Sequence, residues 1–134
     1  MRLVVDTGVF SASLVPKRAI RLASHVKHLS GNQLFLAAAT VAELRFGALL
    51  AEWGDRRRDQ LEARISSTTV IPVDDPLLTT VAQLRLTCRA IGHPLADAAH
   101  ANDLWIAASA VHIGAPIVSA DKIFCDVPGL ELLD

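Results

Sequence analysis

The sequence predicts an α/β fold, a three-layer α/β/α arrangement with a mostly parallel central sheet. Short apolar runs alternate along the chain with longer segments that have helical spacing, an order typical of parallel sheets covered by helices. The runs are continuously apolar, as expected of strands buried on both faces. The chain has 134 residues without repeats or linkers, so we expect one domain spanning residues 1–134.

The first strand is predicted at residues 3–5, where a β-branched run ends in a turn at Asp6 and Gly8. Apolar residues then recur at helical spacing over residues 19–29, which predicts a helix. A second apolar run at residues 33–36 predicts the next strand. Asp6 is therefore expected at the carboxyl end of a buried strand.

A helix is predicted over residues 40–53, because this segment contains strong helix formers and stops at Gly54. Thr40 is a suitable N-cap, and Glu43 follows it three residues later, as in a capping box. Glu43 is therefore expected in the first turn of this helix. A polar helix is predicted next, over residues 56–65.

The third strand is predicted within the β-branched run at residues 68–73. Asp75 followed by Pro76 is a typical N-cap and first helical residue. The helix that they open is predicted to extend to about Ile91, with one apolar stripe.

The segment 103–113 leaves almost no polar face, which predicts a largely buried helix with Asp103 at its start. Strands are predicted at residues 117–119 and 130–133, and Asp121 comes shortly after the first of these two. Ligands of such folds bind at the carboxyl ends of the strands. Acidic residues that follow strands are therefore candidates for a functional site.

Four acidic residues, called the four acids below, occupy positions that could converge at one edge of the sheet: Asp6, Glu43, Asp103 and Asp121. Carboxylates are the ligands that hard cations such as Mg²⁺ prefer, and ions held in this way support phosphodiester hydrolysis. Taken singly, each of these acids is equally well explained as a turn or helix-terminus residue. Together they indicate a metal site, because acids beside apolar strands and helices are unfavourable unless they are paired or bound.

The chain also resembles the PIN-domain ribonucleases of the VapC toxin type over essentially its whole length. The segments that carry this resemblance are VVDTGVFSA, TVAELRFGALLA, NDLWIAASAVHIGAPIVSADKIF and VPGLELL. By this similarity, the four acids match the acidic residues of the family's site, and Thr7 and Ser119 look like the hydroxyl residues that flank it. Gly8 departs from the family's pattern, which has a small polar residue there, and Ser119 stands where threonine is common.

The resemblance implies catalytic, metal-binding roles for the four acids, with Mg²⁺ or Mn²⁺ as the cofactor. It also implies endonucleolytic cleavage of structured RNA, such as tRNA or ribosomal RNA. The expected protein partners are a second copy of the chain, forming a homodimer, and a cognate antitoxin. An apolar content of 51% is consistent with such partners, since it can exceed what one small core hides.

Charge and composition leave the location of any RNA contact open. The net charge of −1 means that RNA must be held by local basic patches. Two candidate patches are Lys17-Arg18 with Arg21, and Arg56-Arg57-Arg58 with Arg64, although a solvated helix face is the simpler interpretation of both. No signal peptide or membrane span is evident, which points to a cytoplasmic protein, and two distant cysteines suggest neither a disulfide framework nor a zinc site.

Two alternative functions fit parts of the same pattern. A receiver-like phosphoacceptor domain would use Asp74 as the acceptor, but it leaves Glu43 and Asp103 unexplained. A PIN-like module that has lost catalysis would bind a partner only, although the four acids argue against it. Asp97 is the first candidate for an additional member of the site, while capping and turn roles are favoured for Asp74, Asp97 and Asp126.

Overall fold

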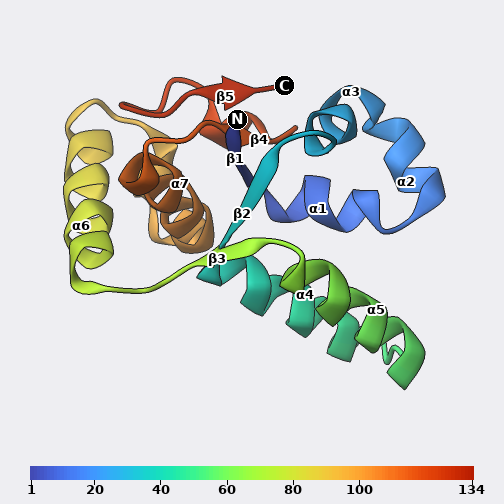
Figure 1. Ribbon diagram of the computed structural model, residues 1–134. Coiled ribbons are helices and arrows are strands. Elements are labelled where there is room, and N and C mark those ends of the chain that lie inside the picture. Colours follow the sequence, from blue (N-terminus) through green and yellow to red (C-terminus); the bar gives the residue numbers. More distant parts are fainter.

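A computed structural model describes residues 1–134 and contains a five-stranded sheet between two layers of helices (Figure 1). All neighbouring strands are parallel, in the order β3-β2-β1-β4-β5. The strands are β1 Arg2–Val5, β2 Gln33–Ala37, β3 Thr69–Ile71, β4 Ile117–Val118 and β5 Leu132–Leu133. The predicted α/β class is confirmed, and the sheet is wholly rather than mostly parallel.

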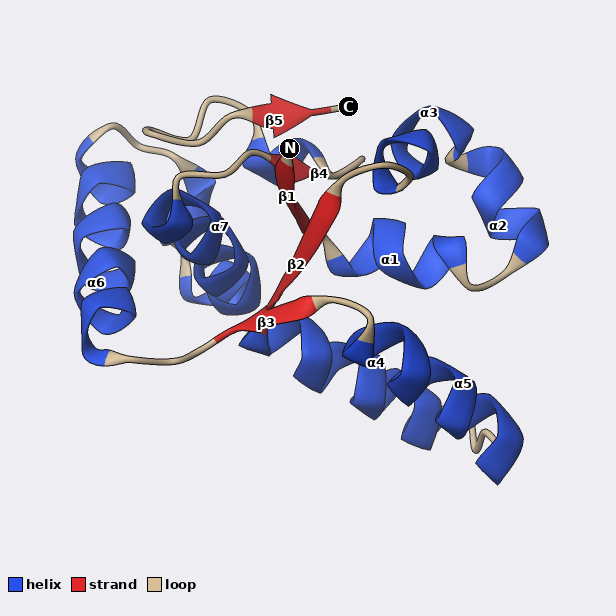
Figure 2. Cartoon of the chain, in the orientation of Figure 1, coloured by secondary structure: helices blue, strands red, loops and turns tan.

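Seven α-helices and four short 3₁₀ turns connect the strands (Figure 2). The helices are α1 Thr7–Ser13, α2 Pro16–Arg21, α3 Ala23–Val26, α4 Ala38–Leu50, α5 Asp55–Ser66, α6 Asp75–Ala90 and α7 Ala101–Ile113. The turns are η1 Lys27–Leu29, η2 Pro94–Ala96, η3 Ala98–His100 and η4 Lys122–Phe124. None of the helices combines the length and apolar character that crossing a membrane requires.

The sheet separates two apolar cores, as the three layers in Figure 1 suggest. One core packs α6 and α7 against the sheet and contains Val4, while the other packs α1, α4 and α5 against it and contains Val5. Neighbouring residues of one strand thus enter opposite cores, because successive side chains of a strand point to opposite faces. This burial on both faces explains why β1 is continuously apolar.

The segment after β1 differs from the prediction. In place of a turn at Asp6 and Gly8, the chain enters α1 directly, with Asp6 as N-cap accepting a hydrogen bond from the Thr7 amide. The single helix predicted over residues 19–29 is also wrong. Leu22 has a non-helical backbone, with φ −109° and ψ 31°, and it divides this segment into α2 and α3.

Two predicted helix starts are also corrected. α4 begins at Ala38 without a side-chain cap, so Thr40 lies inside the helix and Glu43 falls in its second turn. The capping box was therefore wrong. Asp74, rather than Asp75, caps α6 by accepting a hydrogen bond from the Leu77 amide at 3.0 Å.

The strand order reverses between β1 and β4, which are neighbours in the sheet but are far apart in the chain. A crevice at such a switch point, outside the carboxyl ends of the strands, is the usual ligand site of open α/β sheets. Asp6 directly follows β1, and Ser119 directly follows β4. The order also rules out the receiver-like alternative, whose sheet has the order 2-1-3-4-5.

Candidate active site

A cavity of about 380 Å³ lies at this switch point. All of the four acids line it, although they come from four separate parts of the chain: Asp6 after β1, Glu43 in α4, Asp103 in α7 and Asp121 after β4. The remaining lining residues are Thr7, Gly8, Val9, Leu22 and Ala120. The fold therefore brings together the residues that the sequence analysis singled out.

Asp6 is the most buried of the four acids, with 8% of its surface exposed. Its two carboxylate oxygens accept hydrogen bonds from the Thr7 amide at 2.8 Å and the Ser119 hydroxyl at 2.7 Å. The pKa of Asp6 is raised to about 6, mainly by burial and to a smaller extent by repulsion from Asp103 and Asp121. The two hydrogen bonds act in the opposite direction and lower it. Asp6 is therefore charged at neutral pH, although burial disfavours the charged form.

Ser119 connects Asp6 to the second strand end. Its buried hydroxyl donates to Asp6 and accepts a hydrogen bond from the Asp121 amide at 3.0 Å. One oxygen of Asp121 caps η4 by accepting from the Ile123 amide at 3.0 Å. A single serine thereby sets the positions of two acids that follow neighbouring strands.

Glu43 is held by a chain of hydroxyl groups. The Thr7 hydroxyl donates to Oε1 of Glu43 at 2.9 Å, and it lies 3.1 Å from the hydroxyl of Thr40. Thr7 has a single hydroxyl proton, which it donates to Glu43. In the contact between the two threonines, the Thr40 hydroxyl is therefore the donor and the Thr7 hydroxyl the acceptor. Thr40 is fully buried. Its contribution was missed in the sequence, where its position three residues before Glu43 on one helix face was the available signal.

Asp103 lies in the first turn of α7, where the helix dipole favours a negative charge. Its Oδ2 lies 3.3 Å from Nδ1 of His100, and its side chain is less than one-third exposed. Asp97, the candidate for an additional member of the site, caps η3 through the Ala99 amide and does not line the cavity. Asp126 is also absent from the lining and adopts a left-handed turn conformation.

The chemistry of the donors fits a hard divalent cation, since every titratable group that lines the cavity is a carboxylate. Burial is the main cause of the raised pKa of Asp6, and repulsion from Asp103 and Asp121 adds a smaller contribution. No three His, Cys, Asp or Glu side chains are close enough to form a complete metal site. Mg²⁺ tolerates this spacing, because it usually keeps several of its water ligands and needs only one or two direct carboxylates.

Fold and cavity define the class of the protein: a three-layer parallel α/β domain with an acid-lined site at its topological switch point. Within this class, the chain belongs to the PIN-domain family, whose family model matches residues 3–130. It is 30% identical over 128 residues to Ribonuclease VapC5 of Mycobacterium tuberculosis, covering 94% of this chain and 87% of that protein.

Solved structures agree with this assignment. VapBC-5 from Mycobacterium tuberculosis, a member of the VapBC family of toxin-antitoxin systems, includes a chain that matches with a TM-score of 0.63 and 27% identity. The match covers 98% of this chain and 97% of that one. VapBC-1 from nontypeable Haemophilus influenzae matches with a TM-score of 0.78 at 21% identity, covering 100% and 98% of the two chains. The second match shows that the fold is shared.

Proposed function

We propose that this protein is the toxin of a toxin–antitoxin pair, a metal-dependent endoribonuclease that cleaves structured RNA such as tRNA or ribosomal RNA in the cytoplasm. The observation that supports this proposal most directly is the convergence of the four acids around one cavity at the carboxyl edge of the sheet. The names of its relatives, a ribonuclease VapC5 and members of VapBC toxin-antitoxin systems, point to the same activity.

The residues of this chain have distinct tasks in the proposed reaction. The four acids would hold Mg²⁺ or Mn²⁺, which when bound supplies the positive charge that activates water and stabilises the phosphoryl oxygens. The Thr7 amide and the Ser119 hydroxyl orient Asp6, and the Thr7 hydroxyl orients Glu43. Such outer hydrogen bonds fix the geometry of carboxylate ligands before the substrate arrives.

A cleavage assay tests the proposal. Purified protein is incubated with total tRNA or ribosomal RNA in Mg²⁺, in Mn²⁺ or in EDTA, and the products are separated on a denaturing gel. Discrete internal fragments are expected with either metal, and intact RNA is expected with EDTA. Intact RNA under all conditions would contradict the nuclease proposal and favour the alternative of a PIN-like module that only binds a partner.

Replacing Thr7 by valine is expected to lower the rate of metal-dependent cleavage by about 10-fold to 100-fold, the usual effect of removing an outer-shell partner. Valine lacks the hydroxyl that orients Glu43, but it keeps the amide that caps α1 through Asp6. Thr7→Ser is the matched control, since it keeps the hydroxyl and should retain most of the rate. Equal losses in both variants would show that the Glu43 contact has no role in cleavage.

An antitoxin peptide has a suitable surface on α4. Phe46 and Leu50 are 63% and 72% exposed, and they lie three and seven residues after Glu43. This spacing places all three side chains along one helix face, so an apolar helix packed on this face would end beside the four acids. A basic side chain of that helix could then neutralise them. Loss of antitoxin co-purification in the variant Phe46→Glu would support this contact.

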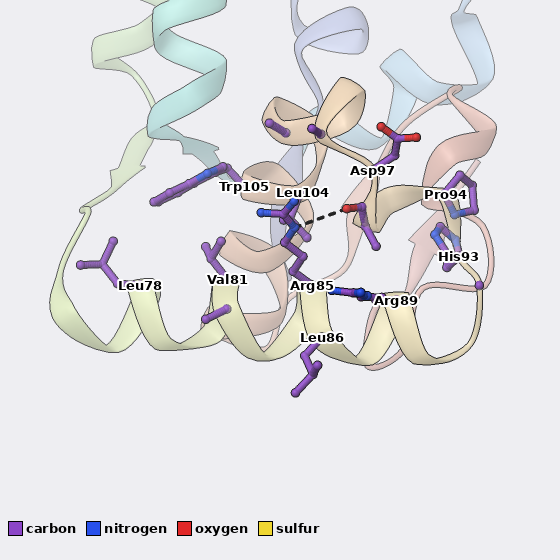
Figure 3. Close-up of a pocket in the computed structure, with 15 residues that line it drawn as sticks. Leu78, Val81, Arg85, Leu86, Arg89, His93, Pro94, Asp97, Leu104 and Trp105 are labelled. Carbon is purple, nitrogen blue, oxygen red and sulfur yellow. Dashed lines mark hydrogen bonds between the residues drawn. The ribbon is translucent and has the colours of Figure 1, made fainter.

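A homodimer has a candidate contact on the opposite side of the sheet. A groove of about 1090 Å³ lies between α6 and α7, with Val81 and Arg85 from one helix and Leu104 and Trp105 from the other (Figure 3). Leu78, at one end of the groove, is 46% exposed. Most of the residues that line the groove are hydrophobic, and we propose that a second copy covers it.

Introducing a charge at Leu78 is expected to convert the dimer to a monomer at micromolar concentration. A buried, unpaired carboxylate is strongly unfavourable in an apolar contact, so Leu78→Glu should lower the mass measured by light scattering to that of one chain. Gln83→Glu changes the charge by the same amount on an exposed part of α6 outside the groove, and it should leave the dimer intact. A wild-type protein that is already monomeric would contradict the proposed dimer.

A further inference from the structure

Two arginines from different helices donate hydrogen bonds to serines of α1. Arg18 of α2 donates a hydrogen bond to the Ser11 hydroxyl at 2.9 Å, and Arg64 of α5 donates one to the Ser13 hydroxyl at 3.4 Å. The guanidinium of Arg64 also lies over the Phe10 ring, 5.6 Å from its centroid. In Figure 1, α2 follows the C-terminal end of α1, and α5 lies below α1. We call Arg18 and Arg64 the flanking arginines.

The flanking arginines have no acidic partner. The arginines of this region that do form ion pairs are Arg58, with Asp55 at 2.7 Å, and Arg45, with Glu62 at 2.8 Å. Residues 16–29, which include Arg18, contain four Lys or Arg and no Asp or Glu, although the whole chain has a net charge of −1. A side chain that only interacts with water has no fixed orientation. The two guanidinium groups, in contrast, are oriented by serine hydroxyls, which are neutral and leave the positive charges free to bind an anion.

The position of the flanking arginines relates them to the cavity. Asp6 caps α1, and a rise of 1.5 Å per residue puts Ser11 and Ser13 roughly 8 and 10 Å further along the helix axis. Leu22, which follows α2, lines the cavity itself. The two serines that bind the flanking arginines therefore lie within the length of one short helix from the four acids.

The cavity by itself repels a nucleic acid, because all of the four acids carry the same sign of charge as the phosphates. We propose that the flanking arginines bind the phosphate backbone of the substrate RNA beside the bond that is cleaved. Such contacts hold a strand in position without reading its sequence. The inference rests on the proposed ribonuclease function, since it assumes that the cavity acts on RNA.

The test measures binding separately from cleavage. A short, fluorescein-labelled single-stranded RNA is titrated with the variant Asp6→Asn, in which cleavage is disabled, and fluorescence anisotropy is recorded in Mg²⁺ between about 50 and 200 mM salt. Adding Arg18→Gln and Arg64→Gln together is expected to weaken binding by about 10-fold or more. It should also lower the slope of log K against log salt by about 1.4, because each phosphate contact on a single strand contributes about 0.7.

Two further variants separate charge from structure. Arg58→Gln removes the same charge from α5, but its guanidinium is already paired with Asp55, so it should change the dissociation constant less than twofold. Arg18→Lys with Arg64→Lys retains the charges and should retain the salt slope. Melting curves of each variant establish that it is folded.

The proposal is overturned if the double glutamine variant binds RNA as Arg58→Gln does, or if the Asp6→Asn parent does not bind RNA. It is also overturned if the arginine substitutions abolish binding of a poly-glutamate peptide while leaving RNA binding unchanged, because the arginines would then serve an acidic protein. Cleavage by the wild-type protein is scored independently. Arginine-dependent binding without cleavage would refute the nuclease function and leave the phosphate contact standing.

Discussion

Replacing Asp6 by asparagine is expected to reduce RNA cleavage by at least about 100-fold, more than the loss of an outer-shell partner costs, while raising the melting temperature of the metal-free protein. Asparagine has nearly the same shape and is also a good N-cap. Its amide can donate to the Ser119 hydroxyl, which has an acceptor lone pair available. The substitution therefore removes a buried negative charge and keeps the local structure.

The gain in stability should depend on pH. The pKa of Asp6 is raised from 3.8 to about 6 in the folded protein, so the folded state binds this proton more tightly than the unfolded state does. The resulting contribution to stability is fully present below pH 3.8 and is lost as the pH rises through about 6. At about 1.4 kcal/mol per pKa unit, ionised Asp6 costs the folded state about 3 kcal/mol. The difference between Asp6→Asn and wild type should thus grow from pH 4 to pH 7, on the order of this energy.

Asp97→Asn is the matched control, because Asp97 is exposed, caps η3 and lies outside the cavity lined by the four acids, in the groove between α6 and α7. It should change neither the cleavage rate nor the pH dependence of the melting temperature. The opposite pattern would refute the site: if Asp6→Asn destabilised the metal-free protein and still cleaved RNA, Asp6 would be only the cap of α1.

Millimolar Mg²⁺ or Mn²⁺ is expected to raise the melting temperature of the wild-type protein. An ion held by the four acids binds the folded state and offsets the repulsion that Asp103 and Asp121 exert on Asp6. At a concentration about 100-fold above its dissociation constant, such a ligand adds about 2.7 kcal/mol to the free energy of unfolding. The measurement is a thermal melt followed by circular dichroism at constant ionic strength, with NaCl replacing the divalent salt in the control.

The metal response should disappear when one of the proposed ligands is removed. Asp103→Asn is expected to raise the metal-free melting temperature, as Asp6→Asn does, and to abolish the shift caused by Mg²⁺. An equal shift in Asp103→Asn and wild type would place the bound ion elsewhere on the protein. A wild-type protein that shows no shift with either ion would remove the support for a metal-dependent reaction.

Much of the architecture was predictable because the strands are local features of the sequence. Buried parallel strands must be continuously apolar, so each of the five strands overlaps a predicted run. Acidic residues at the ends of such runs indicated Asp6 and Asp121. The helix that carries Asp103 was equally evident from its nearly complete lack of polar residues.

Helix boundaries were less predictable, because a cap depends on backbone geometry as well as residue type. Thr40 and Glu43 have the spacing of a capping box, but α4 starts two residues before Thr40 and uses no side-chain cap. Asp74 and Asp75 are chemically equivalent as caps, and only the backbone entering α6 selects Asp74. The break at Leu22 likewise follows from its backbone conformation rather than from its apolar side chain.

The sequence by itself therefore determined the fold class and the strands and singled out the four acids as candidates, since apolar periodicity and residue chemistry are local properties. Only the tertiary structure decided that Thr7 and Thr40 fix Glu43, that Ser119 joins Asp6 to Asp121, and that Asp97 lies elsewhere. The hydrogen bond between Ser119 and Asp6 joins residues 113 positions apart. Such contacts exist only once the sheet has placed β1 beside β4, because no local pattern encodes the distance between two strand ends.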